Sequence, residues 1–561
     1  MLSCIRNIYS HNREESIPIM TTHTNSRAVT VNQIGYPAAA AKLAYFTGEG
    51  RRFEVTIAAT GEVVYRGETG AAVQDAASGV LVAAGDFSAV TVPGRYRIAY
   101  EGESSAEFDI GEQPYSEVHR GLLKAFYYYR CGTELTEAFA GPWTHGPCHL
   151  SHGIVHGEPD RRLDGCGGWH DAGDYGKYTG PGAKAVADLL LAFELYPAAF
   201  SRAIPLPETD GRMPDVLHEC RWELDFLMKM QDPETGGAFH KLTTLKFPPL
   251  DTRPEDDLGD LYFSPISVTA TADFAAVMAL AARIYKPFDA AYAERCLAAA
   301  KRAAAWLEAN PELPGFKNPS DVFTGEYGDS RGDADERYWA AAELYRTTGD
   351  AVYHEQFKQL AAVEFPKYEL GWADMGGYGT IAYLLGGESK ADPALYSRLK
   401  QGLRTEAERI TAVCRADGYG VSLGVRDYKW GSNMNVMNNA MLLLIAYHVH
   451  GEAAFEACAL DQVHYLLGRN VLDTSYVTGF GDRAYNEPHY RPGVADGIEA
   501  AVPGFVSGGP NAGLQDDAMK AHLVGKPPAQ CFIDHKDSYA GNEVTIYWNS
   551  PAVFAVSHWV K

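Results

Sequence analysis

Two carboxylates stand three residues apart in a glycine-rich stretch of this chain. Residues 167–178 have the sequence GGWHDAGDYGKY, so Asp171 and Asp174 are flanked by small and aromatic residues, just before a helical pattern that begins near Ala183. Such a pair can hold a water molecule between its oxygens, and one member can remove a proton from that water. A helix cap or a calcium-binding cluster uses the same spacing, so the pair by itself leaves both interpretations open.

A further carboxyl group that could take part in catalysis lies near the C-terminus. Residues 532–550 have the sequence FIDHKDSYAGNEVTIYWNS, and Glu543 stands at the start of the last apolar helix. Asp534 and Asp537 would raise the pKa of Glu543 in a partly buried site, which suits a general acid. A glutamate at a helix start is also a favourable partner of the helix dipole, so this segment too has a structural interpretation.

A loop with hydrogen-bonding side chains precedes this segment. Residues 476–483 have the sequence YVTGFGDR, and PHYR at 488–491 places His489 and Arg491 two residues apart. A neighbouring His and Arg on a loop can hydrogen-bond sugar hydroxyls. As isolated residues, the two would more often be structural.

Thiol and imidazole groups form a candidate metal set. It consists of Cys131, Cys148, His149 and His170. Two thiolates and two imidazoles suit tetrahedral Zn²⁺. The spacing is not that of a zinc finger, so the residues alone leave the site open.

Two oxygen-rich turns are candidate calcium sites. Residues 329–336, DSRGDADE, open a helix and supply Asp333, Asp335 and Glu336. Hard oxygen ligands in a tight turn suit Ca²⁺, but helix capping and dipole pairing explain the turn equally well. A second candidate, residues 208–215, supplies Asp210 and Asp215.

The elements that position these residues divide into two kinds. Between residues 29 and 112, seven short β-rich runs are separated by turn signals, which predicts an immunoglobulin-like β-sandwich. The runs are AVTVNQ, KLAYF, RFEVTIA, EVVYRG, FSAVTV, YRIAY and SAEFDI. From residue 113 to 561, about a dozen segments carry apolar residues at helical spacing, which fits an all-α (α/α)6 barrel with functional loops at one end. A looser helical bundle is the structural alternative.

The composition limits the partners. The chain has 561 residues and a formal net charge of -23, which disfavours nucleic acid because no basic face is available. No stretch approaches the roughly 20 apolar residues that span a bilayer, so no membrane association is expected. Aromatic residues make up 12%, with 33 Tyr, which favours a carbohydrate partner, although an aromatic-rich core explains the content equally well.

Cysteine usage and the N-terminus suggest a compartment. The nine cysteines are scattered, and Cys220, Cys296 and Cys458 fall in helical patterns as small core residues. An odd count without a visible secretory leader argues for a reducing compartment, so we expect a cytoplasmic protein. We also expect a monomer. Residues 1–28 are expected to be disordered or tag-like, with Met20 as an alternative natural start.

Taken together, the three loop segments resemble the family 9 glycoside hydrolases, chiefly cellulases. Three motifs match in the family's order: the W-H-D-A-G-D-Y-x-K-Y block, T-G-F-G-x-R followed by P-H-x-R, and the closing F-x-D and E-x-T-x-x-x-N-S block. The V-N-Q-I-G-Y start at residues 31–36 looks like the immunoglobulin-like module of one branch, so the resemblance covers the chain after residue 28.

The resemblance implies a role for each matching residue. Glu543 matches the general acid, Asp174 the general base, and Asp171 the partner that helps hold the attacking water. His489 and Arg491 match sugar-binding residues, and Asp534 and Tyr539 match supporting positions around the acid. Many family members have a second His where this chain has Tyr490, which makes the sugar preference less certain.

The resemblance also implies metals. The same branch carries a structural zinc at positions matched by Cys131, Cys148, His149 and His170. A closed set of four ligands leaves no position for substrate, and a zinc there would fix the loop that carries Asp171. A family calcium at an S-G-x-x-D-E turn, completed by an Asp here expected to be Asp374, matches inexactly, because this chain has S-R-G-D-A-D-E.

The function expected from these observations is an inverting endo-β-1,4-glucanase. It would act on cello-oligosaccharides or soluble β-glucans with two carboxyl groups about 6.5–9.5 Å apart. An exo-acting glycosidase of the same family, such as an exo-β-glucosaminidase, is the enzymatic alternative. A non-catalytic carbohydrate-binding protein is the alternative from a different class, and the intact Asp171, Asp174 and Glu543 argue against it.

Overall fold

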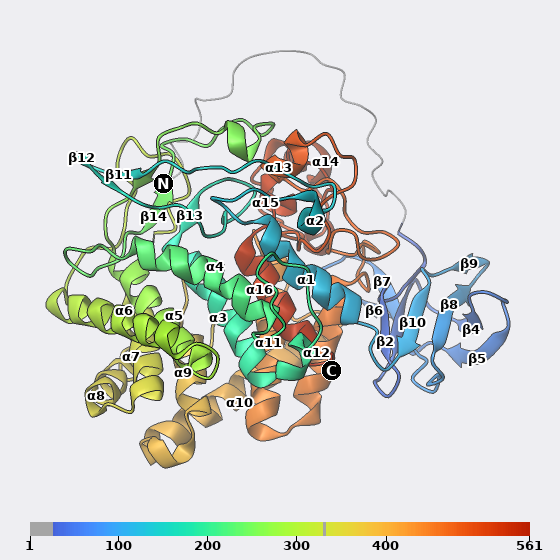
Figure 1. The fold of residues 1–561 in the computed structure, drawn as a ribbon. Helices are drawn as coiled ribbons and strands as arrows, with labels where there is room; N and C mark the ends of the chain where they lie inside the picture. Colours follow the sequence, from blue (N-terminus) through green and yellow to red (C-terminus); the bar gives the residue numbers. More distant parts are fainter. Residues whose placement is uncertain (1–25, 329–331) are drawn as a thin grey trace.

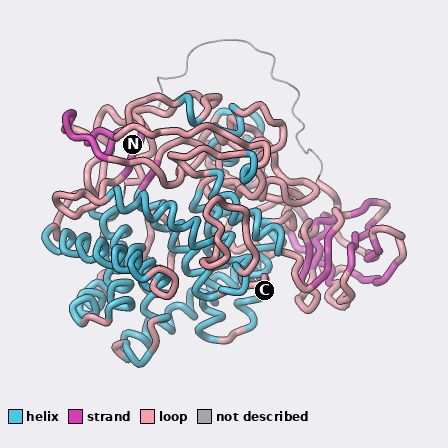
Figure 2. The backbone as a smooth tube through the Cα atoms, viewed as in Figure 1, coloured by secondary structure: helices cyan, strands magenta, loops and turns pink. Residues whose placement is uncertain are grey.

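The computed structural model describes residues 26–328 and 332–561. A small β-rich unit lies beside a large helical body, and the chain between the helices forms extensive loops at one end of that body (Figures 1 and 2). Most of the segment predicted to be disordered or tag-like, residues 1–25, lies outside the described residues.

The β-rich unit is a sandwich of two sheets. One sheet has the strand order β1-β3-β7-β6, and the other has the order β2-β10-β8-β4-β5, with β9 paired to β8. The strands are β1 Val29–Thr30, β2 Gly35–Pro37, β3 Leu43–Thr47, β4 Arg52–Ile57, β5 Val63–Glu68, β6 Val73–Gln74, β7 Leu81–Asp86, β8 Gly94–Tyr100, β9 Glu103–Ser104 and β10 Phe108–Gly111. Side chains between the sheets, among them Phe46, Ile98 and Phe108, form a core separate from that of the barrel.

One predicted strand was misplaced. FSAVTV at residues 87–92 forms turns, and the preceding residues 81–86 form β7 instead. Phe87 and Val90 still bury their side chains in the sandwich, whereas Val92 is exposed. The alanines of β7 carry little β propensity, but pairing with β3 and β6 on either side decides the conformation.

The helical body is a double ring. Within the described residues, helices of ten or more residues number twelve, which confirms the predicted (α/α)6 barrel. The inner ring consists of α3 Thr179–Leu195, α5 Val268–Tyr285, α7 Ala334–Thr348, α9 Gly376–Leu385, α11 Ser432–His450 and α16 Ile546–Ser557. The outer ring consists of α1 Ser116–Tyr128, α4 Asp215–Met230, α6 Ala290–Ala309, α8 Ala351–Leu360, α10 Pro393–Ala416 and α12 Ala453–Leu466.

Inner helices such as α5, α9 and α16 are apolar on nearly every side, as expected for helices enclosed by other helices. All twelve residues of α16 are buried, and its interior Pro551 is tolerated within this packing. Helix α5 is long and apolar enough to cross a membrane by composition, but 89% of it is buried inside the barrel. The short helices α2 Glu137–Ala140, α13 Arg491–Ala495, α14 Asp517–Leu523 and α15 Tyr539–Asn542 belong to the connecting loops.

The loops at one end of the barrel contain a small sheet that periodicity did not predict. Its strand order is β12-β11-β15-β14-β13. The strands are β11 Gly153–Val155, β12 Glu158–Leu163, β13 Lys177–Tyr178, β14 Lys241–Thr243 and β15 Tyr262–Phe263. Because β13 follows the loop with Asp171 and Asp174 directly, the sheet anchors that loop.

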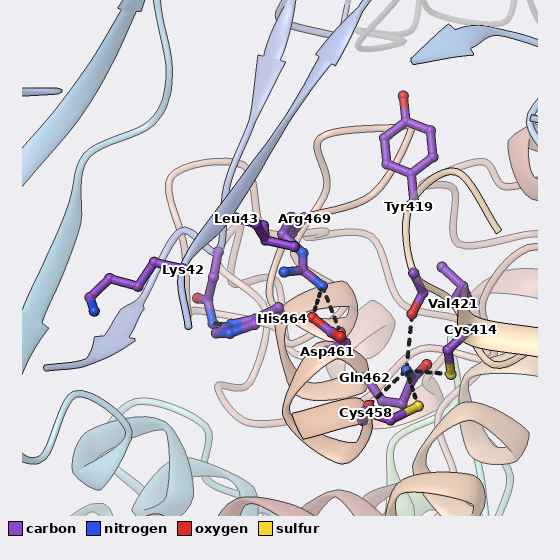
Figure 3. Close-up of polar contacts among 12 residues, drawn as sticks. Lys42, Leu43, Cys414, Tyr419, Val421, Cys458, Asp461, Gln462, His464 and Arg469 are labelled. Atoms are coloured by element: carbon purple, nitrogen blue, oxygen red, sulfur yellow. Dashed lines mark hydrogen bonds and ion pairs between the residues drawn. The ribbon is translucent and has the colours of Figure 1, made fainter. Parts of the chain in front are cut away.

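The sandwich docks on the barrel beside α12. Asn32 Nδ2 lies 2.9 Å from His464 Nδ1, and the Arg469 guanidinium lies 4.9 Å from the centre of the Tyr45 ring. Arg469 also pairs with Asp461 at 2.6 Å (Figure 3). Tyr45, together with Ala77 and Val82 of the sandwich, packs into the barrel's hydrophobic core, so the two units share buried surface.

Candidate active site

Backbone hydrogen bonds fix the loop that carries the two aspartates. The His170 amide donates to the Tyr129 carbonyl at 2.7 Å, and the Trp169 amide donates to the Glu223 carboxylate at 2.6 Å. Within the loop, the Asp171 amide donates to Gly176 O at 2.9 Å, and the Gly176 amide donates to Asp174 Oδ1 at 2.6 Å. The loop is therefore a closed turn with both carboxylates buried.

Glu543 reaches the same place from the other end of the chain. It stands three residues before the first residue of α16, and the Gly508 amide donates to its carbonyl at 3.0 Å. The Ile546 amide donates to the Asp171 carbonyl at 2.9 Å, which ties the start of α16 to the aspartate loop. The structure thus brings Glu543 to Asp171 and Asp174, from which it is about 370 residues distant in the sequence.

Burial raises the pKa of all three carboxyl groups, and repulsion by neighbouring carboxylates adds to this effect for Asp171 and Glu543. Burial is the main cause for Glu543, and the charges of Asp174 and Asp171 raise its pKa further, to well above the ordinary value. Burial also raises the pKa of Asp174, but the Arg491 guanidinium, the Gly176 amide and the Lys241 ammonium oppose this effect. Glu543 therefore has the surroundings of a general acid, whereas Asp174 has positive charges and a hydrogen bond that counteract the effect of its burial, as a general base needs.

Tyr327 is a site residue that the sequence analysis missed. Its hydroxyl donates to Asp171 Oδ2 at 2.6 Å and lies 2.9 Å from the Tyr547 hydroxyl. Its backbone φ of 44° is in the left-handed region that a tyrosine rarely adopts, so the surrounding structure must hold it there. Asp171 Oδ1 is buried and has no hydrogen-bond partner among the described residues, which leaves an acceptor for a water molecule.

The predicted sugar-binding residues lie around Glu543. His489 and Glu543 form a β-bridge, and the His489 Nδ1–H donates to Lys536 O at 2.6 Å, which leaves Nε2 as an acceptor. Burial lowers the pKa of His489 to about 4, so the ring is neutral at pH 7. Tyr539 is 37% exposed, and its ring lies 6.0 Å from that of His489.

Two of these predicted residues make contacts that brace the loops. Arg491 Nη1 donates to Gly173 O at 2.9 Å and its Nε donates to Pro248 O at 3.1 Å. Asp534 accepts from the backbone amides of Asn486 and Glu487, both at 2.8 Å. Tyr490 is buried, and its hydroxyl donates to Tyr128 O at 2.9 Å.

The four predicted zinc ligands converge. One ligand atom from each of Cys131, Cys148, His149 and His170 lies within 4.8 Å of the others, and no other such group occurs in residues 26–328 and 332–561. Asp257 Oδ2 lies 3.2 Å from His149 Nε2. The other ring nitrogen, His149 Nδ1, is buried and has no hydrogen-bond partner among the described residues. A carboxylate behind a ligating histidine is the usual support of a metal site, so the residues fit a tetrahedral ion. Cys166, the spare thiol, is outside this group.

The candidate calcium residues are not drawn together in the same way. Asp333 Oδ2 pairs with Arg337 Nε at 2.9 Å, and Asp335 Oδ2 accepts from the Met375 amide at 2.8 Å. Glu336 is buried beside Asp273, Asp374 has contacts of its own, and residues 329–331 of the turn lie outside the described chain.

The second calcium candidate shows loop-bracing contacts. Asp210 Oδ1 accepts from the Arg212 amide at 2.8 Å and the Met213 amide at 3.1 Å. Asp215 accepts from the Ile204 amide at 2.8 Å and the Thr209 hydroxyl at 2.9 Å. These hydrogen bonds support the capping interpretation of that turn, and the calcium stays a prediction.

A double ring of helices with buried carboxyl groups on the loops at one end is the architecture of a glycoside hydrolase. Glycosyl hydrolase family 9 matches residues 115–556, and the cellulase N-terminal ig-like domain matches residues 24–105. The chain belongs to glycosyl hydrolase family 9, with an N-terminal immunoglobulin-like module. The predicted family, fold and enzyme class are confirmed.

Relatives with known names cover nearly the whole chain. A cellodextrinase of Butyrivibrio fibrisolvens is 39% identical over 549 residues, which are 95% of this chain and 99% of that protein. A single mutant of a thermostable endoglucanase from Alicyclobacillus acidocaldarius is 42% identical, with a TM-score of 0.91, and the match covers 96% of this chain and 100% of that one. A Zn-binding triple mutant of GH family 9 endoglucanase J30 is 34% identical, with a TM-score of 0.88, over 94% of this chain and 100% of that one.

Proposed function

We propose that this enzyme is an inverting endo-β-1,4-glucanase that acts on cello-oligosaccharides or soluble β-glucans. The observation that carries the proposal is the meeting of Asp171, Asp174 and Glu543 in one site, where burial and the charges of the two aspartates raise the pKa of Glu543 well above its ordinary value. The names of the similar proteins, a cellodextrinase and an endoglucanase, support the same substrate class.

Each carboxyl group then has one step to perform. Glu543 gives its proton to the oxygen of the departing sugar as the glycosidic C–O bond breaks. Asp174 takes a proton from a water molecule whose oxygen bonds to the anomeric carbon from the opposite face. Asp171, with Oδ2 held by the Tyr327 hydroxyl, offers Oδ1 to position that water. The product has the inverted anomeric configuration.

Metals complete the proposal as structural elements. A zinc held by Cys131, Cys148, His149 and His170 would cross-link the loop at Cys131 to the loop that begins the aspartate turn. His170 directly precedes Asp171, so the ion would fix the position of that carboxylate. A calcium at Asp333, Asp335, Glu336 and Asp374 is proposed on the oxygen-rich composition of the turn.

Replacement of Glu543 tests the assignment of the acid. Glu543→Gln keeps the shape of the side chain but cannot donate a carboxyl proton. Hydrolysis of cellotetraose should fall by at least about 10³-fold, with binding retained, because proton transfer to the leaving oxygen is lost. Turnover measured by chromatography and binding measured by calorimetry give both quantities. Glu499→Gln at an exposed position is the matched control, and full activity in Glu543→Gln would overturn the assignment.

A further inference from the structure

Lys241 is a fully buried lysine to which the proposed reaction assigns no step. It lies on β14 opposite Tyr178 of β13, with 0% of its surface exposed. Its Nζ donates to Gly325 O at 2.6 Å and to Thr324 Oγ1 at 3.0 Å, with Thr324 O at 3.4 Å. All these acceptors are neutral, and burying an ammonium among neutral oxygens is costly unless a negative charge is near.

Two carboxylates act on this ammonium, those of Asp174 and Glu326. Glu326 is occupied elsewhere, because its oxygens accept from Lys317 Nζ and from the Asn318 amide, both at 3.1 Å. Asp174 accepts a hydrogen bond from the Gly176 amide at 2.6 Å and lies inside the site. Geometry brings the ammonium to the same part of the site, because Lys241 pairs with Tyr178, four residues after Asp174, and its Nζ lies 5.7 Å from the centre of the Tyr178 ring.

Other charged and titratable groups around Asp174 also influence its protonation. Arg491 favours the ionised form of Asp174, as Lys241 does. Asp174 also interacts with the like charges of Asp171 and Glu543 and with the buried Tyr178 phenol. Burial lowers the pKa of Lys241 to about 7, so the ammonium is charged below neutral pH, where Asp174 must resist protonation.

The hydrogen bonds of Lys241 have a second consequence. They hold Thr324 and Gly325, and the His240 Nε2–H donates to Glu326 O at 3.0 Å. The next residue is Tyr327, whose hydroxyl meets Asp171. Two neighbouring side chains at the start of β14 thus hold the three residues that lead into Tyr327.

We propose that Lys241 is a positioning residue of the hydrolytic site, whose ammonium keeps Asp174 ionised and whose hydrogen bonds hold the segment that carries Tyr327 against Asp171. The proposal rests on the proposed function, in which Asp174 is the base. A lysine that only fills space in the core would influence folding but not the protonation of Asp174.

The test is the pH dependence of kcat/KM for cellotetraose in Lys241→Met and Lys241→Arg. Loss of the charge makes Asp174 easier to protonate, so the acidic limb of the Lys241→Met profile should move up by about one pH unit. Lys241→Arg keeps the charge and should leave the limb near its wild-type position. Lys246→Met removes an exposed lysine from the same stretch of chain and should leave the profile unchanged.

The outcomes separate this proposal from the proposed function. Hydrolysis by the wild-type enzyme tests the function itself, before any variant is compared. A Lys241→Met profile with its acidic limb in place would overturn the role of the Lys241 charge, and one that also keeps its full height would overturn the role of the Lys241 hydrogen bonds. If Lys241→Met does not fold, Lys241→Gln keeps a donor for Gly325 O without the charge, and the same comparison applies.

Discussion

Asp174 and Glu543 share one buried site, yet their immediate neighbours differ. Asp174 has the Gly176 amide, the Arg491 guanidinium and the Lys241 ammonium around it, all of which favour its ionised form. Glu543 has chiefly the like charges of Asp174 and Asp171, with Arg491 opposing them. Activity should therefore rise with pH as Asp174 loses its proton and fall as Glu543 loses its own, which gives a bell-shaped profile.

Tyr327→Phe tests whether the Asp171 carboxylate needs its hydroxyl partner. A hydrogen bond to a charged group is worth about 1.5–3 kcal/mol, so kcat for cellotetraose should fall about tenfold or more, with little change in KM. Tyr396→Phe on α10, at the partly exposed outer surface, is the control and should retain full activity. Unchanged kcat in Tyr327→Phe would mean that Asp171 is positioned without this contact.

At the scale of helices, strands and loops, the proposed catalytic carboxyl groups could be predicted from the sequence. The residues that contact them from distant segments could not. Asp171, Asp174 and Glu543 lie in contiguous motifs whose composition stands out in the sequence. Lys241 and Tyr327 enter the site through the pairing of β13 with β14 and the contact of β14 with residues 324–326. Strands of two or three residues, such as β13 and β14, have too little periodicity to be recognised in a sequence, so nothing local marked either side chain. Asp257 was missed because its contact with His149 joins residues 108 positions apart in the sequence.

The proposed zinc ion would act between elements, because it would cross-link two loops. Elemental analysis of protein purified without added metal should give about one zinc per chain, and Cys131→Ser should lose it. Cys166→Ser, a change of the neighbouring spare thiol, should retain the zinc. A zinc-free wild-type protein with normal activity and melting temperature would contradict the zinc proposal.

The calcium proposal is tested by a calcium-selective chelator. Chelation should lower the melting temperature more than it lowers activity at low temperature. An unchanged melting curve after confirmed calcium removal would count against a calcium ion.

The whole molecule depends on a buried junction between sandwich and barrel. Both architectures were predictable, because strand alternation and helical spacing are each repeated many times along the chain. Their docking was not predictable, since it rests on single pairs such as Asn32 with His464 and Arg469 with Tyr45. His464 is 1% exposed and touches Asn32, Tyr115 and the Tyr36 ring.

The pH dependence of stability should report on this junction. Burial, followed by the charges of Arg469 and Lys42, holds the pKa of His464 well below its usual range. Below about pH 6.5 the unfolded chain binds a proton that the folded chain does not, so stability falls by up to about 1.4 kcal/mol per pH unit. His464→Gln should therefore lose less melting temperature than the wild type between pH 7 and pH 5. The exposed His522→Gln should behave like the wild type, and equal losses in all three proteins would contradict the assignment.

The central claim is that two separated carboxyl groups hydrolyse a β-glucosidic bond with inversion. Time-resolved proton NMR of a cellotetraose digest shows which anomer of the new reducing end forms before mutarotation. An inverting mechanism predicts that the α-anomer appears first. Early β-anomer would mean retention of configuration and would contradict the roles given to Asp174 and Glu543.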